Sequence, residues 1–236
     1  MPTAPTASLE FATTIHANKP AAWLIEEAIR RGEGALAANG ALAVDTGVLT
    51  GRCPNDKFLE DTSGIHDTID WGKVNRPITP ERFAVIEKMA REHLDTRETL
   101  YRFDGYAGAD PAYRMKVSAI TEFAWHCQFA STLFIKAAME DLPEFDADWT
   151  ILNACTLQVD DWESLGLNSP VAILQSLEQK KVIIIGTEYA GEMKKSIFYA
   201  MNYDMPDCDV FPMHCSANVA ADDSSNVALF FGLSGT

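Results

Sequence analysis

The sequence is short of positive charge. It has 19 lysines and arginines against 34 aspartates and glutamates, which gives a formal net charge of −15. Such a chain is poorly suited to bind nucleic acid or an anionic membrane surface. It also has no apolar stretch of membrane-spanning length, and the segment 1–19 lacks the basic start and apolar core of a secretory signal. We therefore expect a cytoplasmic protein with no nucleic-acid or membrane partner, in which a few local cations bind any anionic ligand.

Paired cysteine motifs are absent as well. The five cysteines are scattered, odd in number and never in C-x-x-C spacing, which argues against a disulfide framework or a zinc finger: Cys53, Cys127, Cys155, Cys208 and Cys215. Cys208 and Cys215 lie near His214, but we expect them to be small buried side chains rather than metal ligands. Three acidic clusters, at 141–148, 160–163 and 222–223, are expected to be solvated surface.

The pattern of apolar residues predicts a mixed α/β fold. At 236 residues the chain fits one large domain, or one domain and part of another. The pattern predicts helices over 20–32, 79–94, 122–134 and 192–203, and strands over 41–44, 100–103, 115–120, 149–153, 171–177, 181–185, 213–219 and 227–231. The strands at 171–177 and 181–185 are expected to form a hairpin, and 45–57 and 104–111 are expected to be loops.

The C-terminal residues suggest the start of a phosphate-binding loop. The apolar run 227–231 predicts a buried strand, and Gly232, Leu233, Ser234, Gly235 and Thr236 match the first five positions of the P-loop pattern G-x-x-x-x-G-K-[ST]. The motif's lysine and hydroxyl residue are missing, and an ordinary strand and turn would explain the same residues. We predict an N-terminal substrate-binding domain over 1–215 and the start of a nucleotide-binding domain over 216–236.

Two segments carry cations suited to an anionic ligand. Arg52 follows a glycine in the first predicted loop, and its guanidinium can bind a carboxylate through two hydrogen bonds, or it can pair with Asp56 at the surface. The segment 186–195 follows a predicted strand and opens a helix, which places Tyr189, Lys194 and Lys195 near a helix N-terminus where anions bind. The alternative for the two lysines is a solvated helix face.

His214 offers metal chemistry within the predicted strand 213–219. A neutral imidazole there can bind a divalent metal ion. The alternative is a histidine of the core with its hydrogen bonds satisfied.

These motifs, taken in order along the chain, resemble the N-terminal half of the ATP-dependent phosphoenolpyruvate carboxykinase family. The resemblance runs from about residue 35 to the end of the chain. It is carried by six stretches: Thr46–Arg52, Phe103–Asp110, Ile120–His126, Gly186–Lys195, Met213–Val219 and Phe230–Thr236.

The resemblance implies an activity and roles for these residues. The family converts oxaloacetate and ATP to phosphoenolpyruvate, CO₂ and ADP by metal-assisted decarboxylation and phosphoryl transfer to the enolate. Arg52, Tyr189 and Lys195 are expected to bind the dicarboxylate, and Lys194 to stabilise developing negative charge. Lys195 and His214 are expected to bind Mn²⁺ or Mg²⁺ and to approach ATP, whose phosphates lie against Gly232–Thr236.

The sequence departs from the family pattern in two places. Cys53 stands where the family usually has serine, and its thiol is either reactive or an inert replacement. The chain also ends before the P-loop lysine, an acidic metal ligand, a second substrate arginine and the adenine pocket of the family. We therefore expect these 236 residues to be inactive alone. A non-catalytic binding or assembly module and a different P-loop kinase remain alternatives, and the sequence leaves the oligomeric state open.

Overall fold

The structure is a computed structural model that describes residues 11–232. The chain divides into two compact units between Ile197 and Phe198, within helix α4 (Gly191–Asp204).

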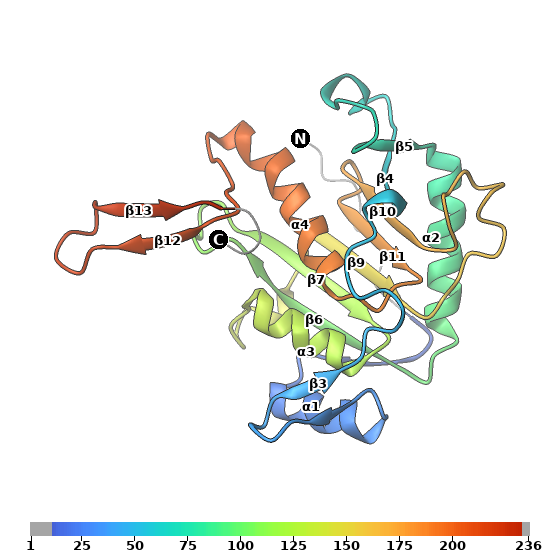
Figure 1. Ribbon diagram of the computed structural model, residues 1–236, viewed down its shortest axis with the longest axis horizontal. Coiled ribbons are helices and arrows are strands. Elements are labelled where there is room, and N and C mark those ends of the chain that lie inside the picture. Colours follow the sequence, from blue (N-terminus) through green and yellow to red (C-terminus); the bar gives the residue numbers. More distant parts are fainter. Residues whose placement is uncertain (1–10, 233–236) are drawn as a thin grey trace. The chain divides into compact units, whose positions relative to one another are not determined.

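The first unit is built on one mixed sheet (Figure 1). Among the described residues this sheet has nine strands, and most neighbouring pairs are parallel. The spatial order is β1 (Thr14–Ala17), β6 (Thr99–Ala107), β7 (Met115–Thr121), β9 (Trp149–Ala154), β11 (Lys181–Ile185), β10 (Ala172–Ser176), β4 (Lys57–Glu60) and β5 (Arg76–Ile78), and β8 (Ile135–Lys136) pairs with β6. The predicted mixed α/β class is confirmed, as is the antiparallel β10–β11 hairpin.

The four predicted helices are present with ends shifted by a few residues. They are α1 (Ala21–Arg30), α2 (Pro80–Asp95), α3 (Ala124–Leu133) and α4. The start of α2 shows why the sequence marks it well: Thr79 caps the helix by accepting a hydrogen bond from the Arg82 N–H at 3.4 Å, and Pro80 occupies the first turn. A 3₁₀ turn that contains Pro206, Met205–Cys208, follows α4.

The remaining short elements of the first unit lie between these. The strands β2 (Gly34–Leu36) and β3 (Leu42–Val44) form a small antiparallel hairpin. Three 3₁₀ turns span Pro54–Asp56, His66–Thr68 and Leu142–Glu144.

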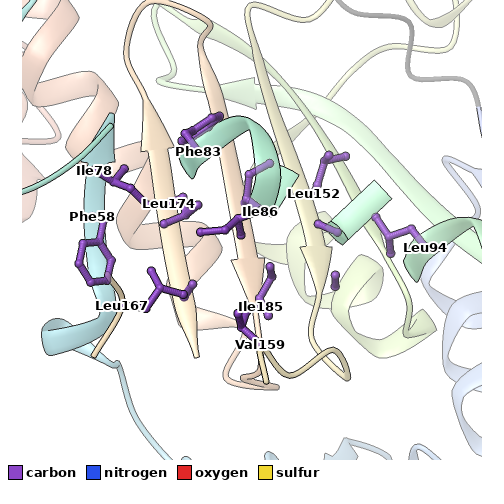
Figure 2. Packing of buried hydrophobic residues seen from close by; sticks show 14 of the residues in the cluster. Phe58, Ile78, Phe83, Ile86, Leu94, Leu152, Val159, Leu167, Leu174 and Ile185 are labelled. Carbon is purple, nitrogen blue, oxygen red and sulfur yellow. The ribbon is translucent and has the colours of Figure 1, made fainter. Parts of the chain in front are cut away.

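Helices cover both faces of the sheet. On one face, side chains of α2 such as Ile86 pack against Leu152 and Leu174 in the main apolar core (Figure 2). Successive residues of a strand point to opposite faces. Asn153, next to Leu152, meets His126 of α3, and the Gln175 side chain donates to the Ser196 carbonyl of α4 at 3.1 Å. The helix α3 and the first turns of α4 therefore lie on the other face, which explains why β9, β10 and β11 are buried at every position.

One predicted loop is part of a strand. β6 continues through Ala107 and pairs with β7 from Tyr101 to that residue, so the prediction of a loop over 104–111 is wrong for 104–107. The polar signal came from Asp104, which is 3% exposed and accepts hydrogen bonds from Ser118 Oγ at 2.8 Å and Asn18 Nδ2 at 2.7 Å. A buried carboxylate with such partners is compatible with a core strand.

The second unit contains an antiparallel pair of strands, β12 (Ser216–Val219) and β13 (Val227–Phe230). The prediction that 227–231 is buried is wrong, since every residue of β13 is exposed and Phe230 retains 57% of its accessible surface. The prediction for Cys208 and Cys215 also fails in part, because the first is exposed and the second only partly buried. The apolar sequence correctly predicted a strand, but the strand's burial was not predictable because it depends on other segments packing over it.

The acidic clusters at 141–148, 160–163 and 222–223 lie at the surface, and their carboxylate-bearing residues are exposed. None of the helices in the part of the chain that the structure describes has the length and apolar character needed to cross a bilayer.

Candidate active site

The strand register brings two distant segments to one edge of the sheet. Ile185, the last residue of β11, pairs with Ala172 of β10, and the next residue of β10 pairs with Lys57 at the start of β4. The loop that carries Arg52 enters β4 at this edge, and the segment that carries Tyr189 leaves β11 at the same edge. The sheet thus joins the two segments in which the sequence predicted anion-binding residues.

A direct hydrogen bond connects these segments. The Glu192 Oε1 atom, in the first turn of α4, accepts from the Cys53 backbone N–H at 2.6 Å across 139 residues of sequence. Both residues are buried, with exposures of 5% for Glu192 and 7% for Cys53. The residue after Arg52 is therefore fixed to the helix that carries Lys194 and Lys195.

The turn after β11 is tightly packed. Gly186 adopts φ +77°, and a Cβ atom there would lie 3.2 Å from the Pro170 carbonyl oxygen and the Val171 Cα. A side chain at Gly191 would clash with the ring of Tyr189, which lies over that glycine. Both glycines are thus required for the path that places Tyr189 beside the start of α4.

His126 supports the same turn from α3. Its Nε2 lies 2.8 Å from the Glu188 carbonyl oxygen and must donate, so Nδ1 accepts from Asn153 Nδ2 at 3.4 Å. Burial lowers the pKa of His126 to about 4, and the ring is neutral near pH 7. Neutral His126 therefore holds the backbone next to Tyr189.

The edge concentrates positive charge. Burial and the nearby Arg52 lower the pKa of Lys57 to about 8, although Glu192 acts in the opposite direction. Burial lowers the pKa of Lys195, and Arg52 and Lys194 lower it further. Arg52 thus affects both Lys57 and Lys195, and Lys194 is next to Lys195, in a chain with a net charge of −15. We call these four residues the cationic edge.

Glu192 is the acidic counterpart within this group. Burial raises its pKa, and the Cys53 N–H, Arg52 and Lys57 oppose that rise. Asp56 accepts a hydrogen bond from Ser169 Oγ at 2.8 Å, and among the described residues no ion pair joins it to Arg52. The guanidinium of Arg52 is exposed, so the surface pairing with Asp56 considered from the sequence is not what the structure has.

The surroundings of Cys53 favour an inert thiol. Burial raises its pKa, as do the charges of Glu192 and Asp56, and a hydrogen bond with Thr187 acts in the opposite direction. A raised pKa leaves little of the nucleophilic thiolate at neutral pH.

The other predicted site residues fall in the second unit. His214 is exposed, precedes β12 and lies with its ring centroid 5.8 Å from that of Phe198, so its expected place inside a strand is wrong. The pairing of His214 with Lys195 on one metal stays a prediction, because the two residues belong to different units. Gly232 is exposed, and Leu233, Ser234, Gly235 and Thr236 lie outside the described residues. Within residues 11–232, no group of three or more histidine, cysteine, aspartate or glutamate side chains is placed to hold a metal.

Sequence reasoning missed three residues at this edge: Lys57, Glu192 and His126. Lys57 lies in the predicted loop 45–57 and Glu192 in the segment 186–195. Only the sheet register shows that these two segments lie at the same edge. His126 belongs to the stretch Ile120–His126, which carried the resemblance. Its neighbours in sequence are mostly apolar and aromatic, and nothing in them indicates a hydrogen bond to the turn after β11.

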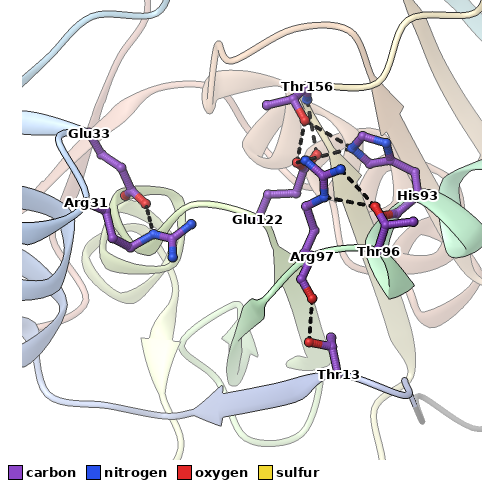
Figure 3. Close-up of polar contacts among 8 residues, drawn as sticks. All are labelled: Thr13, Arg31, Glu33, His93, Thr96, Arg97, Glu122 and Thr156. Carbon is purple, nitrogen blue, oxygen red and sulfur yellow. Dashed lines mark hydrogen bonds and ion pairs between the residues drawn. The ribbon is translucent and has the colours of Figure 1, made fainter.

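Glu122 in the same stretch serves the scaffold. Its buried carboxylate accepts from Thr156 N at 3.1 Å and lies 3.2 Å from His93 Nε2 and 3.8 Å from Arg97 (Figure 3). Because His93 is in α2 and Arg97 follows it, this cluster ties the end of β7 to the end of α2.

A cavity of about 510 Å³ lies elsewhere, beside α1. It is lined by β1, α1 and the start of β6, and Glu27 and Arg30 within it pair with each other at 2.6 Å. None of the predicted site residues lines it. Its lining includes two acidic and two basic side chains, so it carries no excess of positive charge for an anion.

Comparison with known proteins decides the family. The model of the ATP-type phosphoenolpyruvate carboxykinase family matches residues 13–236. The chain belongs to this family. It is 48% identical to the phosphoenolpyruvate carboxykinase (ATP) of Brevibacillus brevis over 95% of its own length, and 44% identical to that of Geobacillus kaustophilus over 94%. Each alignment spans 42% of the relative, so the chain covers less than half the length of these carboxykinases.

Proposed function

We propose that the full-length protein that contains this chain is an ATP-dependent carboxykinase. It would convert oxaloacetate and ATP to phosphoenolpyruvate, CO₂ and ADP. The observation that carries the proposal is the cationic edge, where Arg52 and Lys195 share one electrostatic neighbourhood in a strongly acidic chain. Family membership supports the same reaction.

Arg52 and Tyr189 bind the dicarboxylate substrate in this proposal. The exposed guanidinium of Arg52 offers two parallel N–H donors to a carboxylate, and the Tyr189 hydroxyl offers a third donor from the turn that His126 supports. Because both groups stand on a fixed edge of the sheet, the carboxylates are oriented before reaction.

Loss of CO₂ breaks a carbon–carbon bond and leaves its electron pair on the enolate. In this proposal Lys194 and Lys195 would stabilise that developing negative charge. The enolate oxygen then attacks the γ-phosphorus of ATP, and the bond between that phosphorus and the leaving ADP oxygen breaks.

Lys195 and His214 would hold a divalent ion, Mn²⁺ or Mg²⁺. A lysine ligates a metal only as the neutral amine, and the lowered pKa of Lys195 fits that requirement. The bound ion supplies Lewis-acid stabilisation of negative oxygens. The residues Gly232–Thr236 would begin the cradle for the ATP phosphates, at the start of a nucleotide-binding domain over 216–236.

The 236-residue chain alone is proposed to have no turnover. It corresponds to 42% of the carboxykinase from Brevibacillus brevis, and a P-loop lysine is not among its residues. Phosphoryl transfer needs groups that hold the terminal phosphates in line.

The test is an assay of the full-length protein for phosphoenolpyruvate formation from oxaloacetate, with and without ATP and Mn²⁺. We expect formation that requires both and that falls about a hundredfold or more in Arg52→Ala, because a charge-assisted bidentate contact is lost. Arg30→Ala, which removes an exposed arginine at the end of α1, is the matched control and should keep activity. ATP hydrolysis that is indifferent to Arg52 would instead indicate a different P-loop kinase, and ligand binding without turnover would indicate a binding module.

A further inference from the structure

Glu192 occupies an unusual place for a first-turn helix glutamate. Such residues usually face solvent, where they interact with the helix dipole. Glu192 is 5% exposed instead, and its Oε1 accepts the Cys53 N–H at 2.6 Å. Burying a carboxylate is costly unless charges and hydrogen bonds compensate for its lost hydration. The bond to the Cys53 N–H offsets part of that cost.

The compensation comes from the proposed site itself. Arg52 and Lys57 both stabilise the ionised form of Glu192, and they belong to the loop and the strand that follows it. Glu192 in turn favours the protonated form of Lys57. The carboxylate thus fixes the backbone beside Arg52 and partly balances the cations around it.

We propose that Glu192 is a positioning residue that holds the Arg52 loop against the start of α4. This inference rests on the proposed function for its catalytic consequence, but the link itself concerns only the loop. Glu192 sets the position of Arg52 relative to Lys195 at the start of α4.

Cys53 provides a readout of this link that does not depend on activity. Its side chain is 7% exposed, and the bond to Glu192 involves its own backbone N–H. Release of the loop exposes the thiol. Cys127 and Cys155 are buried in α3 and directly after β9, and they report global opening of the same fold.

The experiment measures iodoacetamide alkylation of each cysteine by peptide mass spectrometry in the full-length protein. We expect Glu192→Ala to raise the alkylation rate of Cys53 by about tenfold or more, because a buried charge-assisted hydrogen bond is lost. Glu192→Gln keeps an acceptor oxygen and should stay within about threefold of the unsubstituted protein. Cys127 and Cys155 should remain protected in both variants, and exposed Cys208 is the positive reference.

Steady-state kinetics of the same variants distinguishes a positioning role of Glu192 from a general loss of folded structure. Glu192→Ala should raise the KM for oxaloacetate more than it lowers kcat, and Glu192→Gln should restore most of the loss. Unchanged alkylation of Cys53 in Glu192→Ala, with a folded protein, would overturn the inference even if carboxykinase activity is present. If the unsubstituted protein shows no turnover, the proposed function fails, and the alkylation result still decides whether Glu192 holds the loop.

Discussion

Two apolar strands of similar sequence have opposite surroundings in this molecule. β11 reads Lys-Val-Ile-Ile-Ile and is buried at every position, whereas β13 reads Val-Ala-Leu-Phe and is exposed at every position. β11 has a strand on each side and helices over both faces of its sheet, while β13 pairs only with β12 in the described residues. An apolar run therefore indicates a strand, but burial depends on the layers that other segments supply.

The difference between β11 and β13 also affects the predicted site residues that follow each strand. The turn after β11 starts from a fully packed strand and is held by His126 and Glu192, so Tyr189 and the lysines of α4 have fixed starting points. The residues after β13 that were predicted to cradle phosphates begin at an exposed strand. The turn after β11 is therefore supported by packing and hydrogen bonds, whereas β13 is exposed.

Truncating one core residue should give the largest effect. Ile183→Ala is expected to lower the free energy of unfolding by about 2–5 kcal/mol, because Ile183 of β11 is fully buried in the core. Leu229→Ala, its counterpart in β13, should change it by no more than about 0.5 kcal/mol. All five tryptophans lie in the first unit, so urea unfolding should be followed by far-UV circular dichroism, which reports both units, together with tryptophan fluorescence. Equal losses for the two variants would contradict the comparison.

The pH dependence of stability should identify His126. Its pKa in the folded protein is about 4, below the value near 6.5 expected when unfolded, so acid favours the unfolded state, which binds the extra proton. The stability contribution of the neutral ring is complete above pH 6.5 and should fall by roughly 3 kcal/mol as the pH drops to 4. Urea unfolding at several pH values should show this slope in the unsubstituted chain and not in His126→Gln.

His66→Gln is the matched control for this slope. His66 is exposed, and its hydrogen bond with Asp61 raises its pKa, so its contribution to stability is present at low pH and is lost as the pH rises through the folded pKa. Its removal should therefore leave the acid-induced loss in place. The account of the turn is wrong if His126→Gln retains the full slope.

The smallest expected effect concerns two glycines. Gly186 and Gly40 both have positive φ, but only at Gly186 would an added Cβ atom have neighbours within 4 Å. Gly186→Ala should cost about 1 kcal/mol more than Gly40→Ala, because the added methyl group must displace packed backbone. Urea unfolding gives this difference, and only Gly186→Ala should also lower kcat/KM in the full-length protein. Similar costs and unchanged kinetics would show that the turn after β11 is not tightly constrained.

Much of the fold followed from local patterns. The apolar runs that became β9, β10 and β11 and the Thr79–Pro80 helix start gave correct elements because their signals are local. Asp104 misled the prediction because a satisfied buried carboxylate looks like a loop residue in sequence. The exposure of β13 could not be predicted from its own sequence either, because burial depends on which other segments pack over the strand.

The site was only partly predictable for a similar reason. Arg52, Tyr189, Lys194 and Lys195 were singled out by residue type and by resemblance. That their two segments lie at one edge of the sheet depends on the β10–β11 hairpin being placed between β4 and β9, and no short motif encodes that placement. Lys57 and Glu192 became visible as site residues only through that register.

The most direct test of the cationic edge is the replacement of Arg52 by lysine in the full-length protein, with Arg30→Lys as the control. Lysine keeps the charge but loses the planar pair of donors. We expect kcat/KM for oxaloacetate to fall about tenfold or more in Arg52→Lys and to stay unchanged in Arg30→Lys. Equal activity in both variants would contradict the claim that Arg52 binds the substrate carboxylate at the edge shared by β4 and β11.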